Sequence, residues 1–287
     1  FAFGGVMVAR LPFLNHLATL CWAPALALFF RRPFALALVL ALMFLAGFPT
    51  FVPGCAAAAW AVAFAADRAH TRESAAVARR WKAAVGWAGA GLLSAALAAV
   101  QLLPSLELAA HSRRAGGVGI VEALTLGFSA RDLLQWIGPL AVGRARFHPA
   151  DEWWTCVYLG VAGAYAALCG ARALPRRRSV IVVAALAAAM LLTLGGSNPL
   201  SGALWRGLPF LRFVRYPGNL AYLALLPLAV LIGAGLSRRR AAPILVLLAA
   251  FELVVLGRAA TPLAPRGLFV SAGPLVRALQ ERLDGTR

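Results

Sequence analysis

NLAYLALLPLAVLIGAGLSRRR, residues 219–240, runs from Asn219 to Leu236 without a charged side chain and then ends in three arginines. A run of about 20 apolar residues can cross the hydrocarbon core of a bilayer as a helix, and a basic end is typical of its cytoplasmic boundary. Hydrophobic residues make up 62% of the 287 positions and charged residues only 13%, which is more apolar surface than a water-soluble domain can bury. The sequence therefore predicts an all-α, polytopic bundle of transmembrane helices.

Apolar runs of this kind predict eight complete spans and the remnant of another that ends near Val8. The spans are expected at 14–30, 34–50, 52–66, 84–104, 154–171, 179–195, 219–236 and 242–257. They form a transmembrane domain over 1–257, and residues 258–287 begin an extracytoplasmic C-terminal region. Because Phe1 lies inside an apolar run and the last residues resemble an interrupted helix, we expect a fragment that lacks residues at both ends.

The basic residues predict how the chain is oriented. Short basic loops alternate with the spans, so the net charge of +18 is assigned to the membrane boundary and not to nucleic-acid binding. The cytoplasmic loops are expected at Arg31-Arg32, Arg68 to Lys82, Arg172 to Arg178 and Arg238 to Arg240. The segments 105–153 and 197–218 then lie outside.

The outer segment 105–153 contains sparse polar residues among apolar ones. This pattern predicts short interfacial helices at about 119–128 and 132–137. Four aromatic residues suit the headgroup level: Trp136, Trp153, Trp154 and Tyr158. The four cysteines have no paired spacing and no metal-ligand pattern occurs, so the sequence indicates no metal site and no cofactor.

A first candidate site follows Pro104. Glu107, His111, Arg113 and Arg114 fall within about two helical turns, and such a group suits a phosphate or a hydroxyl that must be positioned. Under the alternative interpretation, Pro104 only kinks the helix exit while the charges form a solvated ion-pair network.

Two further outer clusters are candidate substrate-binding sites. Asp151 and Glu152 precede two tryptophans and follow the basic residues Arg144, Arg146 and His148. These carboxylates suit a general base, metal ligands or acceptors of sugar hydroxyls, although a polar collar above an aromatic belt gives the same pattern. Arg212 and Arg215 alternate with aromatic residues, and their planar guanidiniums suit a phosphate, although a loop that grips lipid headgroups also fits. Glu252 lies inside an apolar run, where a carboxylate is costly, so we expect it to face the bundle interior.

Short motifs occur in order along the chain: Trp22-Ala23-Pro24, Ala46-Gly47-Phe48-Pro49-Thr50, Val100 to Glu107 with Ser112-Arg113-Arg114, Asn198-Pro199-Leu200 and Leu211 to Pro217. Over Phe1 to Leu256 this order resembles the YfhO-like bacterial membrane proteins, which belong to the GT-C class of membrane glycosyltransferases. At Phe48 the sequence departs from that family, whose members often have a histidine there. The phenylalanine at this position removes support for a functional role of the motif at residues 46–50.

The resemblance implies a function. A protein of this family is expected in the bacterial inner (cytoplasmic) membrane, where it transfers a sugar from a polyprenyl-phosphate carrier to a cell-envelope polymer on the outer face. Arg113, Arg114, Arg212 and Arg215 would then hold the phosphate and Glu107 would orient the acceptor, while the catalytic base is expected upstream of this fragment. Two alternatives stay open: a transporter or flippase of a lipid-linked or anionic solute, and a non-catalytic scaffold for envelope assembly.

Overall fold

The computed structural model describes residues 7, 13–67, 73–112, 115–136, 157–208, 211, 216–237, 240–260, 273 and 282. Every element within these ranges is a helix, as the composition predicts. The longer helices are α2 (Leu14–Leu20), α3 (Ala23–Leu28), α4 (Pro33–Leu45), α5 (Phe51–Asp67), α6 (Glu73–Leu97), α7 (Ala99–Ala110), α9 (Val161–Ala173), α10 (Arg176–Thr193), α11 (Pro199–Gly207), α12 (Leu225–Leu236) and α13 (Ala242–Ala260). The short elements are α8 (Ile120–Ala123) and the 3-10 helices η1 (Ala130–Trp136), η5 (Gly195–Ser197) and η7 (Pro217–Ala224).

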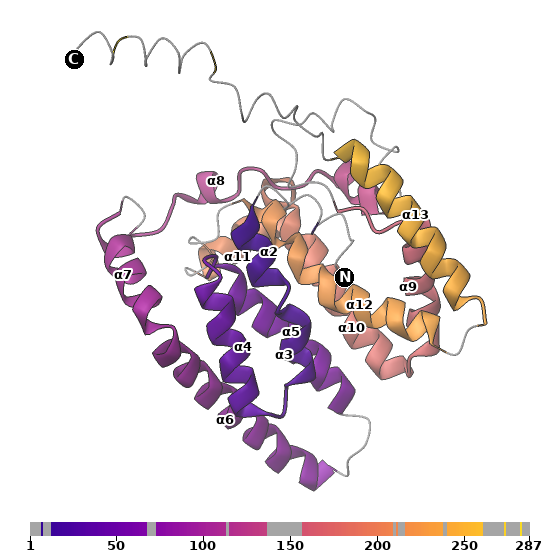
Figure 1. Cartoon of the computed structure of the whole chain (residues 1–287), viewed down its shortest axis with the longest axis horizontal. Helices are drawn as coiled ribbons and strands as arrows, with labels where there is room; N and C mark the ends of the chain where they lie inside the picture. The colour runs from indigo at the N-terminus through magenta and orange to yellow at the C-terminus, as the bar shows by residue number, and fades with distance from the viewer. Residues whose placement is uncertain are drawn as a thin grey trace.

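The helices form two packed groups (Figure 1). In the N-terminal group α4 packs against α6, and α3 packs against α5. In the C-terminal group α9 packs along α12, while α13 lies at the outer edge against α9. Because α5 contacts both α10 and α12, it joins the two groups into one bundle.

Proline breaks the first predicted span. Residues 14–30 were expected to form one helix, but α2 ends at Leu20 and α3 begins at Ala23. Pro24 stands in the first turn of α3, where its missing N–H costs nothing, whereas inside a continuous helix it would leave the carbonyl of Leu20 without a donor. The predicted helix is therefore interrupted at Cys21-Trp22, and its two pieces together form the apolar helix Leu14–Leu28.

A second expected span, 84–104, is bent. The axis of Trp81–Leu97 turns by 83° into Ala99–Ala110, so the turn lies before Pro104, which stands inside α7. Glycines weaken the helix ahead of the turn, and the Ser94 hydroxyl donates to the carbonyl of Gly91 at 2.8 Å. Such back-bonding and the glycines both favour a bend in this part of the helix, and the turn follows four residues after Ser94, at Ala98.

The apolar runs of the C-terminal half form helices close to the predicted ranges, with shifted ends. α9 begins only at Val161, since Gly160 has a φ of +88° that ends regular structure before it. The run at 219–236 begins as the 3-10 helix η7 and continues as α12, so that one apolar helix spans Pro217–Leu236.

The segment 120–136 packs onto the bundle. Phe128 N donates to the carbonyl of Thr193 at 2.7 Å, and Gly218 N donates to the carbonyl of Leu126 at 3.3 Å. Phe128 is fully buried. Short helices were predicted here and occur as α8 and η1, but their apolar residues are in part buried against the ends of α10 and η7.

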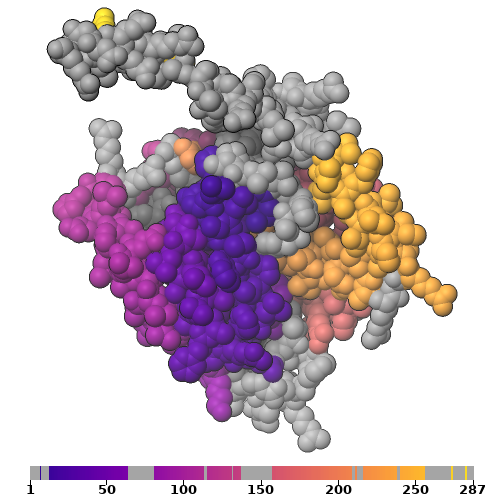
Figure 2. Space-filling model, in the orientation of Figure 1, coloured from indigo at the N-terminus to yellow at the C-terminus, as the bar shows by residue number. Residues whose placement is uncertain are grey.

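The outer surface of the bundle is apolar in many places. Phe34 on α4, Leu92 on α6 and Phe251 on α13 are 81%, 76% and 68% exposed. Figure 2 shows α13 standing along one edge of the molecule, where such side chains face outward. Soluble monomers rarely expose apolar side chains on this scale.

Length separates one helix from the others. Within the described ranges, Pro217–Leu236 alone is long and apolar enough to cross a membrane, and the number rises to two if Trp81–Leu97 and Ala99–Ala110 count as one bent span. Shorter apolar helices cover Leu14–Leu28, Pro33–Leu45, Pro49–Ala63 and Ala242–Val255. The helical class is therefore shown, while the number of crossings remains a prediction.

Candidate functional site

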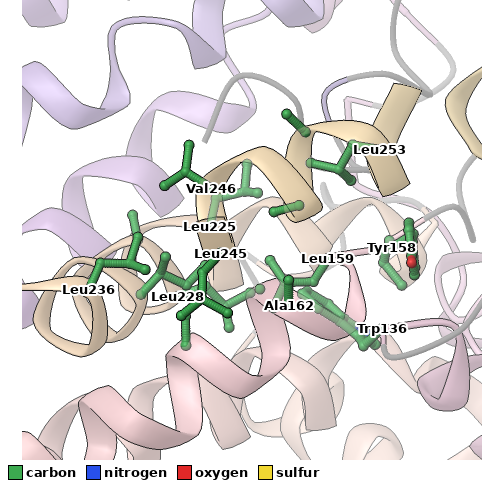
Figure 3. A pocket seen from close by; sticks show the side chains of 17 residues that line it. Trp136, Tyr158, Leu159, Ala162, Leu225, Leu228, Leu236, Leu245, Val246 and Leu253 are labelled. Carbon is green, nitrogen blue, oxygen red and sulfur yellow. The ribbon is translucent and has the colours of Figure 1, made fainter. Parts of the chain in front are cut away.

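A cavity of about 300 Å³ lies between α9, α12 and α13 (Figure 3). It is partly open and its lining is almost entirely apolar. The main lining residues are Trp136, Tyr158, Leu159, Ala162, Ala166, Leu225, Leu228, Ile232, Leu236, Leu245, Val246, Ala249 and Leu253.

The crossing of α9 and α12 explains why there is a cavity. At this crossing Gly170 lies against the carbonyl of Leu231, and Gly235 lies against the carbonyl of Ala166. A Cβ on either glycine would come within 2 Å of that carbonyl oxygen, so the two backbones approach as closely as helices can. The small side chains of Ala162 and Ala166 on α9 leave space beside α12, and α13, which packs against α9, forms the remaining wall of the cavity.

Glu252 lies beside the cavity, next to the lining residue Ala162, but does not line it. Its Oε2 atom accepts a hydrogen bond from the N–H of Ala162 at 3.2 Å. The first turn of a helix has N–H groups without intrahelical partners, so Glu252 of α13 caps α9. Its negative charge is stabilised by the positive end of the α9 dipole. The prediction that Glu252 faces the bundle is confirmed by this contact.

Gly160 makes room for that carboxylate. A Cβ at this position would lie 2.8 Å from Glu252 Oε2, and the φ of +88° is one that L residues rarely adopt. Glycine is therefore required here both by conformation and by space.

Trp136 and Tyr158 are aromatic residues that line the cavity. Both are buried, at 5% and 6% exposure, so they do not stand on an exposed belt as their predicted place at the headgroup level suggested. The carbonyl of Trp136 accepts from the N–H of Leu159 at 3.2 Å, which ties η1 to the start of α9. The indole Nε1 atom of Trp136 is buried and has no hydrogen-bond partner among the described residues.

A buried carboxylate fixes the turn that positions Trp136. Asp132 Oδ2 accepts from both the N–H and the hydroxyl of Ser129 at 2.7 Å, and its Oδ1 accepts from Gln135 Nε2 at 3.2 Å. These bonds hold η1 in place, since a buried carboxylate is stable only when its oxygens are satisfied.

The chemistry of the cavity suits a hydrocarbon chain. None of the described lining residues is charged. The cavity volume is about ten times the volume that one water molecule occupies in the liquid. The only lining side chain with a titratable group is Tyr158. The shape and lining suit an apolar ligand, and among the lining residues there is no acidic, basic or thiol side chain to act as a nucleophile or general base.

The candidate residues predicted from sequence lie elsewhere. Glu107 and His111 are exposed on and just after α7, one helical turn apart, and neither lines the cavity. The other predicted binding residues lie outside the described ranges: Arg113, Arg114, Asp151, Glu152, Arg212 and Arg215. Within those ranges no three His, Cys, Asp or Glu side chains gather closely enough to hold a metal ion.

Sequence reasoning did not identify the cavity. Ala162 and Leu228 are ordinary members of apolar runs, and no periodicity marks them as lining a cavity. Two residues in the sequence pointed to this part of the molecule: Glu252, a carboxylate within an apolar run, and Gly160, a glycine within another apolar run. No protein-family model, curated protein or solved structure matches this chain.

Proposed function

We propose that this chain is a polytopic membrane protein of the bacterial inner membrane, of the GT-C type, that handles a polyprenyl-phosphate-linked sugar on the outer face. The exposed apolar side chains on α4, α6 and α13 support the membrane part, because hydrocarbon is the solvent in which such a surface is stable. Together with the shorter apolar helices, they favour more crossings than the single long helix provides.

The observation that carries the proposal is the cavity between α9, α12 and α13. It continues to the surface, since Val246 lines it and is also 51% exposed beside other outward-facing apolar residues of α13. A chain in surrounding lipid can therefore enter from the side. We assign to this cavity a segment of the polyprenyl tail.

The phosphate and sugar would then lie above the cavity. Arg113, Arg114, Arg212 and Arg215 are the groups proposed to hold the phosphate, because guanidinium contacts two oxygens at once. In the transfer the acceptor hydroxyl oxygen bonds to the anomeric carbon, the bond from that carbon to the phosphate oxygen breaks, and a carboxylate takes the hydroxyl proton. Glu107 is proposed to orient the acceptor.

Photo-crosslinking tests the cavity. The full chain in vesicles is irradiated with a diazirine-tagged polyprenyl phosphate, and the labelled peptides are mapped by mass spectrometry. We expect labels on the cavity walls from α9 and α12, and their loss in Ala249→Phe, which fills the cavity from a half-buried position. The matched control on α13 is Leu247→Phe, which is exposed and outside the lining. Equal labelling of both variants would refute the proposed tail site.

A kinetic experiment tests whether Arg212 and Arg215 bind the donor phosphate. Transfer is measured against the concentration of the lipid-linked sugar for Arg212→Lys, Arg215→Lys and the double variant at matched membrane levels. Lysine keeps the charge but loses the two-pronged contact, so apparent affinity for the donor is expected to fall. If all three variants keep the parent's affinity and turnover, these arginines are only a basic interfacial anchor.

A flippase is the second candidate, and the bend between α6 and α7 favours it. Transporters often build their sites from broken helices, and the 83° turn provides one. The two functions separate in an assay without acceptor. A flippase moves the lipid-linked sugar across the vesicle membrane, whereas the glycosyltransferase leaves it in place.

A further inference from the structure

The helix α7 has no buried residue. Val100, Leu103, Leu106 and Leu108 are 80%, 65%, 64% and 73% exposed, although each is a large apolar side chain. A helix that packed onto its own bundle would bury one face. Something other than the described part of this chain therefore covers α7.

One side of α7 is formed by leucines. Leu102 and Leu106 are four residues apart, and Leu103 is three residues before Leu106, so the three fall within an arc of about 100°. Ser105 falls on the other side of the helix, where Leu108 is also exposed. The leucine side suits a boundary between hydrocarbon and water.

The direction of α7 indicates which boundary this is. Its axis is turned by 83° from Trp81–Leu97, a helix whose own side chains Val85 and Leu92 are exposed and apolar. If α6 crosses the bilayer, α7 must run nearly parallel to the membrane plane. The exposed apolar surface is continuous from α6 onto α7, which favours one and the same covering medium for both.

Charge agrees with this placement. Arg113 and Arg114 follow α7 in the sequence, and Glu107 is the only acidic residue in the helix. Arginines at the end of a surface helix are attracted to the anionic headgroups of a leaflet.

We propose that α7 is an interfacial helix that lies flat on the outer leaflet, with Leu103 and Leu106 at the acyl boundary and Ser105 towards water. This rests on the proposed membrane topology. It deepens the proposed function, because it places Glu107 and His111 at the height of the lipid headgroups, where a carrier phosphate also lies.

Depth measurements on spin labels test this placement. The full chain, with its four cysteines replaced by serine, receives a single label at Leu103→Cys, Ser105→Cys or Val85→Cys and is reconstituted in phosphatidylethanolamine and phosphatidylglycerol vesicles. Collision with oxygen and with a water-soluble nickel chelate gives the depth of each label. Val85 serves as the spanning control, roughly 18 Å along α6 from the bend.

The expected result is graded. The label at position 103 lies about 5–10 Å below the phosphates, position 105 is open to the nickel chelate, and position 85 is deep. With position 85 deep, three results overturn the proposal: position 103 as open to nickel as 105, both α7 labels as deep as 85, or position 103 shielded from both reagents by protein. If position 85 itself is open to water, the membrane proposal fails first and this inference fails with it.

Discussion

Replacing Gly235 by alanine should destabilise the protein more than any other single-methyl change on α12. The added Cβ would lie 1.9 Å from the carbonyl oxygen of Ala166, where 3.4 Å is the lower limit of ordinary contact. Because the obstacle is backbone, a rotamer change cannot relieve it, and α9 must move away from α12 by about 1.5 Å. A gap of that size forfeits more than half of the dispersion energy along the crossing.

The magnitude follows from that separation. Overpacking in a closely packed interface costs roughly 1–3 kcal/mol, and a clash with backbone belongs at the upper end, about 3 kcal/mol. Thermal unfolding of the purified protein in detergent should show a fall in Tm of about 5 °C. Gly170→Ala should behave alike, since its Cβ would lie 1.8 Å from the carbonyl oxygen of Leu231.

The control and the double variant sharpen the test. Gly233 is on the same helix, and a Cβ there would meet no atom within 4 Å, so Gly233→Ala should be neutral or stabilising by up to about 1 kcal/mol. One separation of the helices accommodates both added methyl groups. The double variant of Gly170 and Gly235 should therefore cost less than the sum of the two single changes. If Gly235→Ala unfolds at the temperature of Gly233→Ala, the close crossing of α9 and α12 is wrong.

Three further results are expected. Glu252→Leu leaves the capped N–H of α9 buried without an acceptor and should lower unfolding stability by about 1–3 kcal/mol in the same thermal assay; an unchanged Tm would refute the cap. Gly54→Ala would place a Cβ 1.9 Å from the hydroxyl of buried Tyr222 and should cost about 1–3 kcal/mol, whereas Gly86→Ala, in open space, should not; equal losses would contradict this packing. An impermeant thiol reagent on intact cells should label His148→Cys and not Arg177→Cys in a cysteine-free background, and the reverse pattern would overturn the topology.

Hydrophobicity located the helices because burial and membrane insertion both select long apolar runs. The predicted run 179–195 corresponds to α10, and 242–257 corresponds to α13. The breaks within the helices depend on single residues, which the hydrophobicity of a whole run does not reveal. Pro24 was visible in the sequence as a reason to divide 14–30, whereas no proline stands at the turn at Ala98.

The cavity depends on tertiary contacts and so could not be predicted from the sequence. Its shape follows from the crossing of Gly170 with Gly235, two glycines that look like many others in the chain. Likewise, the sequence predicted that Glu252 must have a partner, because a carboxylate in an apolar run is costly, but it gave no means of choosing the N–H of Ala162.

The bond between Glu252 and Ala162 also bears on how the chain is made. The two residues are 90 positions apart, so α9 leaves the ribosome well before α13 does. If α13 inserts into the membrane as proposed, a carboxylate near its middle opposes its release into lipid by roughly 3 kcal/mol, and the hydrogen bond from the N–H of Ala162 offsets part of that cost. We therefore expect α13 to leave the translocon poorly when it follows a leader without α9, and efficiently when α9 precedes it, as glycosylation-site mapping of the nascent chain would show.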